Sequence, residues 1–148
     1  MPNRFELFTF LITSIHRSIH RIKSEFMDEL GLMSSHVPIL YYLTVKGPMS
    51  ITELAEMSLD DKANISRAAV ALEKKGLVAR NGRGRRLILS LTEEGQPVGL
   101  RIRTGIERVL AVSAKGLSEE ERAAMYSALS TVNENLNAFI LEGEDGAN

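Results

Sequence analysis

Basic side chains gather in one stretch of the sequence, residues 62–86. That stretch holds eight lysines and arginines and a single acid, Glu73, so its net charge is +7, whereas the rest of the chain carries −8. A cationic block on an otherwise acidic chain is suited to binding a polyanion, because the block attracts what the remainder repels. A solvated charged face is the alternative for a charge run taken alone, and the surrounding elements must decide between the two.

Residue types that could support catalysis or metal binding are few. The chain has no cysteine, which excludes disulfides, thiolate metal sites and cysteine nucleophiles. Ser66 and Arg67 have no neighbouring base, and no nucleophile elbow or phosphate-binding loop is present. His16 and His20 have the i, i+4 spacing of two metal ligands on one helix face, but the sequence fixes no third ligand. We therefore predict no enzyme, no cofactor and no bound metal, and interpret these histidines as surface or interface residues.

Length and composition are typical of one globular domain. The chain has 148 residues, of which 44% are hydrophobic and 25% charged, and this composition favours folding over disorder. No apolar run approaches the ~20 residues of a membrane span, and the first residues lack the pattern of a signal peptide. The sequence therefore predicts a single domain over residues 1–148, located in the cytoplasm and without a membrane partner.

A pair of short helices is expected at residues 52–75, within and just before the basic block. Thr52 is the expected cap of the first helix, and Asp60 or Asp61 is the expected cap of the second. Apolar residues recur in the second helix at helical spacing, which leaves one face polar. Such a face can enter a DNA major groove and reach base edges.

A β-hairpin is expected directly after the helix pair. Two apolar runs, 77–80 and 87–91, flank a loop that contains Gly82 and Gly84. Glycine allows a tight turn close to a sugar-phosphate chain, and the arginines of this loop suit the negative potential of a narrow minor groove. The helix pair and the hairpin, in this order and with the charge concentrated on them, favour DNA binding over a solvated face.

Long amphipathic helices are expected on both sides of this region. A stripe of apolar residues runs along residues 5–30, Ser34 or Ser35 is expected to cap the next helix, and a short strand is expected at 49–51. After the hairpin, Thr92 is expected to cap a helix that runs to about residue 115, with a late start or a slight kink at Pro97. A last helix follows, with a capping box of Ser118 and Glu121. The final six residues, 143–148, are expected to be frayed.

These elements predict a mainly α fold with a small β-hairpin, a winged helix-turn-helix with long flanking helices. The apolar stripes of the flanking helices are more surface than one small lobe can cover, which favours a homodimer. The predicted division is a winged helix-turn-helix lobe at about 34–92 and dimerisation helices at about 5–30 and 93–141.

The run SITELAEMSLDDKANISRAAVALEKKGLVAR, followed by GRRLILSLTEEG, resembles the MarR family of transcription regulators. The resemblance extends over the whole chain and is most specific at residues 50–95. It implies a winged-helix homodimer in which the first, fifth and sixth helices interleave, and a regulator, most simply a repressor, that binds a pseudo-palindromic operator. Many members lose DNA affinity when a small, often phenolic molecule or an oxidant acts on them. The lack of cysteine rules out the thiol-based form of oxidant sensing.

The same resemblance assigns roles to individual residues. Asn64, Ser66 and Arg67 match the exposed part of the recognition helix, and Arg85 matches the wing arginine. The family's wing carries an acid two residues before that arginine, where this sequence has Arg83, so this wing is expected to be looser or to bind phosphate more strongly. Together with the charge distribution, the expected DNA contacts are Thr52, Lys62, Asn64, Ser66, Arg67, Lys74, Arg80, Arg83, Arg85 and Arg86.

An effector pocket is also expected by resemblance, between the dimer helices and the DNA-binding lobe. Its candidate lining residues are His16, His20, His36 and Tyr41. The expected partners are double-stranded DNA, a second copy of the chain and a small aromatic effector. The alternative function is an antirepressor or protein-interaction module that keeps the fold without specific DNA binding, and the intact basic wing argues against it.

Overall fold

The computed structural model describes residues 3–146. The chain forms two compact units, Met1–Glu107 and Arg108–Asn148. The first unit contains α1 (Arg4–Leu30), α2 (His36–Lys46), β1 (Met49–Ser50), α3 (Ile51–Ser58), α4 (Lys62–Lys74), β2 (Val78–Asn81), a 3₁₀ turn (Gly84–Arg86) and β3 (Ile88–Leu91). Helix α5 (Gly95–Ser113) crosses the boundary, and α6 (Glu119–Asp145) lies in the second unit. In the part of the chain that the structure describes, no helix has the length and apolar character needed to cross a membrane.

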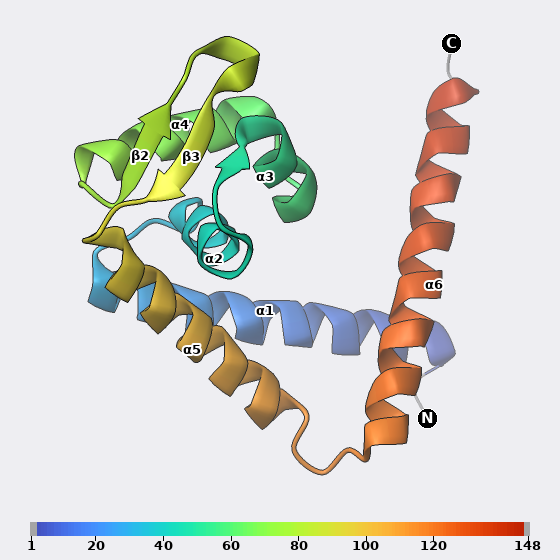
Figure 1. Cartoon of the computed structure of the whole chain (residues 1–148). Helices are drawn as coiled ribbons and strands as arrows, with labels where there is room; N and C mark the ends of the chain where they lie inside the picture. Colours follow the sequence, from blue (N-terminus) through green and yellow to red (C-terminus); the bar gives the residue numbers. More distant parts are fainter. Residues whose placement is uncertain (1–2, 147–148) are drawn as a thin grey trace. The chain divides into compact units, whose positions relative to one another are not determined.

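A small lobe of helices and strands forms the centre of the first unit (Figure 1). Its antiparallel sheet has the order β1-β3-β2, with Met49 opposite Leu89 and Val78 opposite Leu91. Helices α2, α3 and α4 supply most of the rest of the core, to which α1 contributes Met27 and α5 contributes Ile102. The side chains that are almost fully buried are Ile39, Leu40, Leu54, Ile65, Leu72, Val78, Leu89 and Ile102. The predicted fold class, mainly α with a β-hairpin, is confirmed, and the short strand predicted at 49–51 adds a third strand to the hairpin.

The C-terminal end of α1 and the N-terminal part of α5 pack against this lobe. Met27 of α1 and Ile102 of α5 belong to the same hydrophobic core. The two helices approach closely at Gly105, where an added Cβ would lie 3.0 Å from the ring of Phe26. The helix predicted at 5–30 is confirmed as α1, and Gly31 ends it in the left-handed conformation, as expected for a glycine at this position.

Helix α3 begins earlier than the sequence prediction. Thr52 was the expected cap, but the N-cap is Ser50, whose hydroxyl accepts a hydrogen bond from the Glu53 amide while the Glu53 carboxylate accepts one from the Ser50 amide. These two reciprocal hydrogen bonds satisfy the backbone N–H groups of Ser50 and Glu53 at the start of the helix. A cap at Thr52 would leave both N–H groups without these partners. The Thr52 prediction was therefore wrong as a cap, and the same motif predicted at Ser118 and Glu121 is confirmed.

Three other helix ends can be compared with the predictions. Ser35 occupies the N-cap of α2, but its side chain makes no capping bond. Helix α5 starts late, at Gly95, as predicted, and Pro97 lies in its first turn, where a missing donor costs little. The hydroxyl of Thr92, the predicted cap, accepts a hydrogen bond from the Gly95 amide at 3.0 Å. Helix α6 continues through Asp145, past the expected fraying point, because an isolated glycine at 143 weakens a helix without ending it. Residues 147 and 148 lie outside the described part.

Candidate nucleic-acid interface

Helix α4 has one buried face and one exposed cationic face. Its buried residues are Ile65, Ala68, Ala69 and Leu72. Among the residues expected to contact DNA, Ser66 and Asn64 are half-buried, and the rest are exposed, namely Thr52, Lys62, Arg67, Lys74, Arg80, Arg83, Arg85 and Arg86. All the cations of this set are therefore accessible on the surface of the lobe, as a nucleic-acid contact requires.

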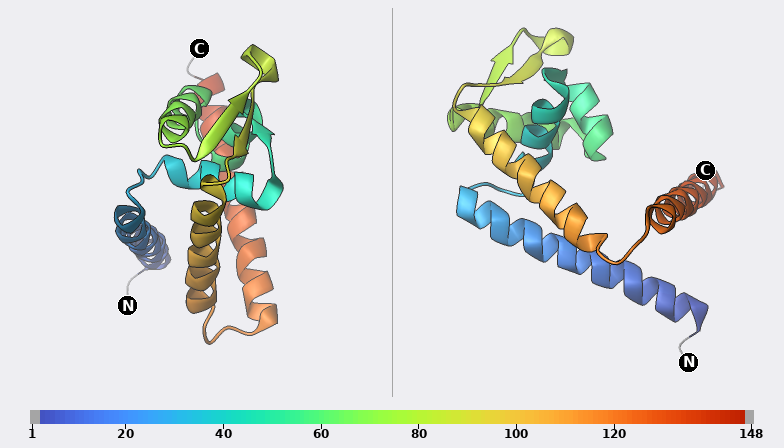
Figure 2. Two further views of the ribbon diagram at one scale, coloured as in Figure 1. Left: turned by 60° about the vertical axis from the view of Figure 1, so that its left-hand side comes forward. Right: turned by 60° about the horizontal axis from the view of Figure 1, so that its bottom comes forward.

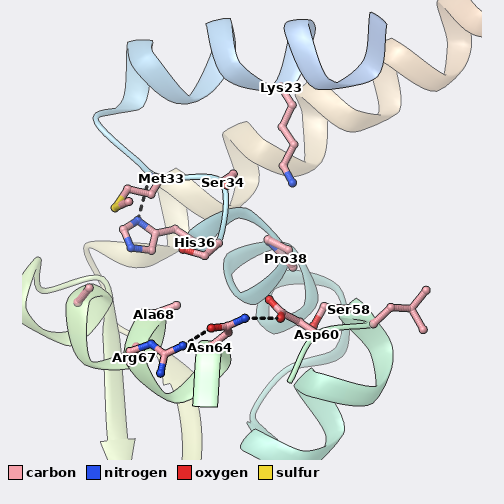
Figure 3. Close-up of a pocket in the computed structure, with 13 residues that line it drawn as sticks. Lys23, Met33, Ser34, His36, Pro38, Ser58, Asp60, Asn64, Arg67 and Ala68 are labelled. Carbon is pink, nitrogen blue, oxygen red and sulfur yellow. Dashed lines mark hydrogen bonds between the residues drawn. The ribbon is translucent and has the colours of Figure 1, made fainter. Parts of the chain in front are cut away.

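The first turn of α4 is fixed by two adjacent carboxylates with different tasks. Asp61 is the N-cap, and its Oδ1 accepts a hydrogen bond from the Asn64 amide nitrogen at 2.7 Å. Asp60 instead binds the side chain of Asn64: its Oδ1 accepts a hydrogen bond from Asn64 Nδ2 at 2.9 Å. Asn64 Oδ1 in turn accepts a hydrogen bond from Arg67 Nη2. Asp60, Asn64 and Arg67 thus form a continuous chain of hydrogen bonds, visible in Figure 3.

The electrostatics of this chain favour a charged Asp60. Hydrogen bonds from the Asn64 side chain and then from the Asp61 backbone hold the pKa of Asp60 below its usual range, since both donors stabilise the ionised form. Asp60 is therefore a carboxylate at neutral pH, and a carboxylate only accepts hydrogen bonds.

The wing is built differently from the start of α4. Its tip is the 3₁₀ turn Gly84–Arg86 between β2 and β3, and it projects from the lobe in both views of Figure 2. Gly82 has φ of +91°, and a Cβ at this position would collide with the Arg86 carbonyl. The glycine is thus required by the shape of the tip.

The arginines of the wing tip have no acidic partner among residues 3–146. Arg83, Arg85 and Arg86 are exposed and take part in none of the ion pairs of the described chain. Arg80, on β2, lies 3.7 Å from the Glu73 carboxylate of α4 (Nη1 to Oε1), and this pair is partly exposed. The tip therefore offers three uncompensated cations, in agreement with the replacement of the usual acid by Arg83.

A hollow of about 610 Å³ lies beside the start of α4 (Figure 3). Asn64 and Arg67 of α4 line it on one side, and Lys23 points into it from α1. Met33 and Leu59 lie at its edge, and both side chains are largely exposed. The hollow therefore combines two cations with an apolar edge, and it includes two of the residues expected to contact DNA.

His36 also lines the hollow, and its hydrogen bonding defines its protonation state. It is buried, and its Nδ1 accepts a hydrogen bond from the Met33 amide at 3.1 Å. Burial, followed by the charge of Lys75, lowers the pKa of His36. A neutral imidazole that accepts at Nδ1 carries its proton on Nε2, so His36 has one N–H left to donate.

The other residues predicted to line an effector pocket are not in this hollow. His16 and His20 are exposed on α1, and Tyr41 is partly buried against the core and contacts Tyr42 edge-to-face. Among residues 3–146, no three histidine, aspartate or glutamate side chains gather in a way that could hold a metal ion. Sequence reasoning missed Lys23, Met33, Leu59 and Asp60, because no local pattern in the sequence connects them.

The helices outside the lobe expose long apolar faces. On α1 the exposed fractions run from 42% at Ile12 to 54% at Ile15, and the exposed apolar residues of this stripe are Phe8, Leu11, Ile12, Ile15, Ile19 and Ile22. In the second unit α6 has no buried residue, and its exposed apolar residues include Met125, Leu129, Leu136, Phe139 and Ile140. Faces of this size on a globular protein mark interaction surfaces.

Comparison with known sequences places the lobe in a family. The MarR family profile matches residues 32–82. One relative is the HTH-type transcriptional repressor MdtR of Bacillus subtilis, 32% identical over 100 residues, or 66% of this chain and 64% of the relative. An uncharacterized HTH-type transcriptional regulator of Bacillus cereus is 26% identical over 117 residues, or 76% of this chain and 78% of the relative.

Solved structures share the architecture of nearly the whole chain. A MarR family regulator from Neisseria meningitidis has a TM-score of 0.78 at 17% identity, over 96% of this chain and 99% of that one. A putative MarR family regulator from Listeria monocytogenes, complexed with 26mer DNA, has a TM-score of 0.76 at 27% identity, over 92% and 90%. BpsR of Bordetella bronchiseptica, whose DNA binding is regulated by 6-hydroxynicotinic acid, has a TM-score of 0.72 at 18% identity, over 89% and 98%.

The helix pair, the three-stranded sheet and the basic wing define a winged-helix DNA-binding protein of transcription regulation. Within this class, residues 32–82 match the MarR family, and the solved structures that share the fold of nearly the whole chain include MarR family regulators.

Proposed function

We propose that the chain is a sequence-specific transcription repressor that binds a pseudo-palindromic operator as a homodimer. The observation that carries this proposal is the presence, on one lobe, of an exposed cationic face on α4 and a basic wing tip that pairs with no acid among residues 3–146. A recognition helix can read base edges in a major groove while a wing contacts the adjacent backbone or minor groove. The repressor name of the Bacillus subtilis relative and the DNA complex of the Listeria regulator support the proposal.

The direct test is selection of bound duplexes from a random library, followed by mobility shifts with the selected duplex and with unrelated DNA. We expect a duplex with two related half-sites, separated by about 10–10.5 base pairs or a multiple. Equal affinity for all duplexes, or no binding to any, would contradict the proposal and favour a protein-interaction module.

The homodimer part of the proposal rests on the exposed apolar faces of α1 and α6. A second copy of the chain is the natural cover for these faces, since two-fold symmetry would match a two-fold operator. We propose that residues 34–92 form the DNA-binding lobe and that residues 5–30 and 93–141 form the dimer helices. Ile15→Glu on the apolar stripe should shift the mass in analytical ultracentrifugation toward the monomer. Thr13→Glu, on the opposite face of α1, is the control and should leave the mass unchanged.

We also propose that a small aromatic acid releases the repressor from DNA by binding in the hollow beside α4. Lys23 and Arg67 attract the carboxylate, which must lie away from Asp60 in the same lining, and the apolar side chains of Met33 and Leu59 accept the ring. Because Arg67 lines the hollow, an anion bound there would draw it away from DNA. BpsR, with its 6-hydroxynicotinic acid, supports an effector of this class.

Calorimetry with 6-hydroxynicotinic acid tests this effector proposal. Binding should weaken in Lys23→Ala, while the uncharged 6-hydroxynicotinamide should bind more weakly than the acid to the unmodified protein. Equal binding of acid and amide, or an unchanged affinity in Lys23→Ala, would show that the hollow does not hold this ligand in the proposed way.

A further inference from the structure

Asp60 is an acidic residue at a position where DNA binding alone would disfavour one. It lies two residues before the basic block 62–86, next to the N-cap of the helix that is proposed to enter the groove. A carboxylate there repels phosphates, and the helix cap is already provided by Asp61. The task of Asp60 in the structure is different, because its Oδ1 accepts hydrogen bonds from the Asp61 amide at 2.8 Å and from Asn64 Nδ2 at 2.9 Å.

The hydrogen bond from Asn64 to Asp60 fixes which way the Asn64 amide points. A carboxylate only accepts and a guanidinium only donates. Asn64 must therefore turn its NH₂ group toward Asp60 and its oxygen toward Arg67, as the structure shows. A flipped amide would place two acceptors together on one side and two donors together on the other. Asp60 and Arg67 thus hold a single orientation of the amide.

The fixed amide keeps the groups needed to read a base. An asparagine side chain has two N–H donors and two acceptor lone pairs, and one of each is used within the chain of hydrogen bonds. One donor and one acceptor remain, which is the complement that adenine N7 and N6–H₂ require in the major groove. Without Asp60, the amide would be free to turn, and its conformational entropy would be lost only when DNA binds, which would weaken binding.

We infer that Asp60 is a positioning residue for base recognition: it acts through Asn64, and through Asn64 on Arg67, rather than by contacting DNA itself. The inference rests on the proposed DNA-binding function and deepens it by assigning the α3–α4 turn to specificity. Asp60 and Asp61 are adjacent and chemically identical, yet the structure gives them separate roles. Asp61 stabilises the helix backbone, whereas Asp60 orients the side chains that lie on it.

The test compares variants of the full-length protein on one duplex and its single-base-pair variants. The duplex is first selected from a random library with the unmodified protein. Affinities are then measured for Asp60→Ala, Asp60→Asn, Asn64→Ala and the double variant Asp60→Ala/Asn64→Ala. Asp61→Ala is the matched control, and thermal unfolding of each variant reports whether the lobe is intact.

We expect Asn64→Ala to lose discrimination at one base pair of each half-site. Asp60→Ala should lose part of it at the same base pair, by about three- to tenfold, with unchanged or slightly tighter binding to random DNA. Asp60→Asn, which keeps an acceptor oxygen, should lose less. The double variant should discriminate no worse than Asn64→Ala alone, since Asp60 acts through Asn64. Asp61→Ala should lower the unfolding temperature and weaken binding to all duplexes by a similar factor.

Three results would overturn the inference. Asp60→Ala could weaken binding to all duplexes equally, as the control does, or its effect could add to that of Asn64→Ala. Asn64→Ala could also leave discrimination unchanged, in which case the proposed repressor function stands and the positioning role does not. If the unmodified protein selects no duplex, the proposed function fails and the inference fails with it.

Discussion

Arg67 at the start of α4 and Arg85 at the tip of the wing are both exposed arginines, but their surroundings differ. Arg67 donates to Asn64, which is held by Asp60, so its environment is organised before any DNA arrives. Arg85 lies in a short 3₁₀ turn and takes part in no ion pair within residues 3–146. Pre-oriented groups suit base readout, and cations without an acidic partner suit phosphates, which carry no direct sequence information. The comparison predicts specificity from the helix and general affinity from the wing.

The largest effect is expected from Asn64→Ala, which removes the oriented amide. It should cost about 1–3 kcal/mol on the preferred duplex and little on random DNA. Mobility shifts or anisotropy on both DNAs measure the difference. Equal losses on the two DNAs would remove the distinction between helix and wing, because Asn64 would then contribute affinity without reading a base.

Arg85→Ala should have a smaller effect that is the same on all DNAs. Loss of one phosphate contact should weaken specific and random binding alike, by about tenfold near 0.1 M salt, and make the slope of log affinity against log salt shallower by about one unit. A titration of both DNAs over a range of salt concentrations measures both quantities. A loss confined to the preferred duplex would mean that the wing reads sequence.

Arg83→Asp restores the acid that is usual two residues before the wing arginine. If Arg83 contacts DNA, as its exposed and uncompensated charge favours, this change should weaken binding and flatten the salt dependence further than an alanine would. The same salt titration measures it, with Arg83→Ala as the control. A rise in affinity would instead mean that the acid helps hold Arg85 and that Arg83 makes no useful contact.

The helix side of the lobe should also respond to pH, whereas the wing should not. The pKa of His36 is lowered in the folded state from 6.5, so the unfolded chain binds the proton more readily. The contribution of neutral His36 to stability is therefore complete above pH 6.5 and is lost as the pH falls below it. Protonation of Nδ1 would also break the bond from Met33. Arginines remain charged throughout this range.

Urea unfolding as a function of pH measures this contribution. His36→Gln should be less stable than the unmodified protein at pH 7.5, and the difference should shrink as the pH falls below 6.5. His16→Gln and His20→Gln, which replace exposed histidines of α1, are the comparison variants. An unaltered pH dependence in His36→Gln would show that His36 does not titrate as the structure indicates.

The sequence predicted the elements well because their signals are local. The stripe of α1, the capping box at Ser118 and the glycine-containing hairpin each depend on residues a few positions apart. Thr52 was misassigned as a cap although Ser50 and Glu53 have the same local spacing as Ser118 and Glu121, and the reciprocal bonds of Ser50 and Glu53 identify Ser50 as the cap.

The hollow could not be predicted in the same way. Lys23, His36 and Arg67 line it, but they come from three different helices, and their meeting depends on how the end of α1 packs on the lobe. The family resemblance predicted an effector pocket lined by His16, His20, His36 and Tyr41, and of these four His36 lines the hollow. Asp60 was read as an alternative cap for α4, because sequence alone does not separate two adjacent aspartates that could each fill that role.

The wing and the turn before α4 also use different residues at positive φ, and this difference gives the smallest predicted effect. The wing uses Gly82 and Gly84 at positive φ, whereas the turn before α4 places Leu59 at φ of 53°. A left-handed leucine costs roughly 1–2 kcal/mol, and Leu59 has no packing to offset it, because its side chain is 94% exposed.

Leu59→Gly should relieve this strain. Since glycine loses about 0.5–1 kcal/mol more through conformational entropy on folding, the relief of roughly 1–2 kcal/mol should leave a net gain of between zero and about 1.5 kcal/mol of stability. Leu59→Val should destabilise the protein by about 1 kcal/mol or more, because a β-branched residue fits the left-handed region poorly. Urea unfolding measures both, and Gly82→Ala serves as the opposite control, since it should destabilise the wing. A destabilised Leu59→Gly would mean that the exposed leucine makes a contact in solution, with a second copy of the chain or across the hollow, that offsets its backbone strain.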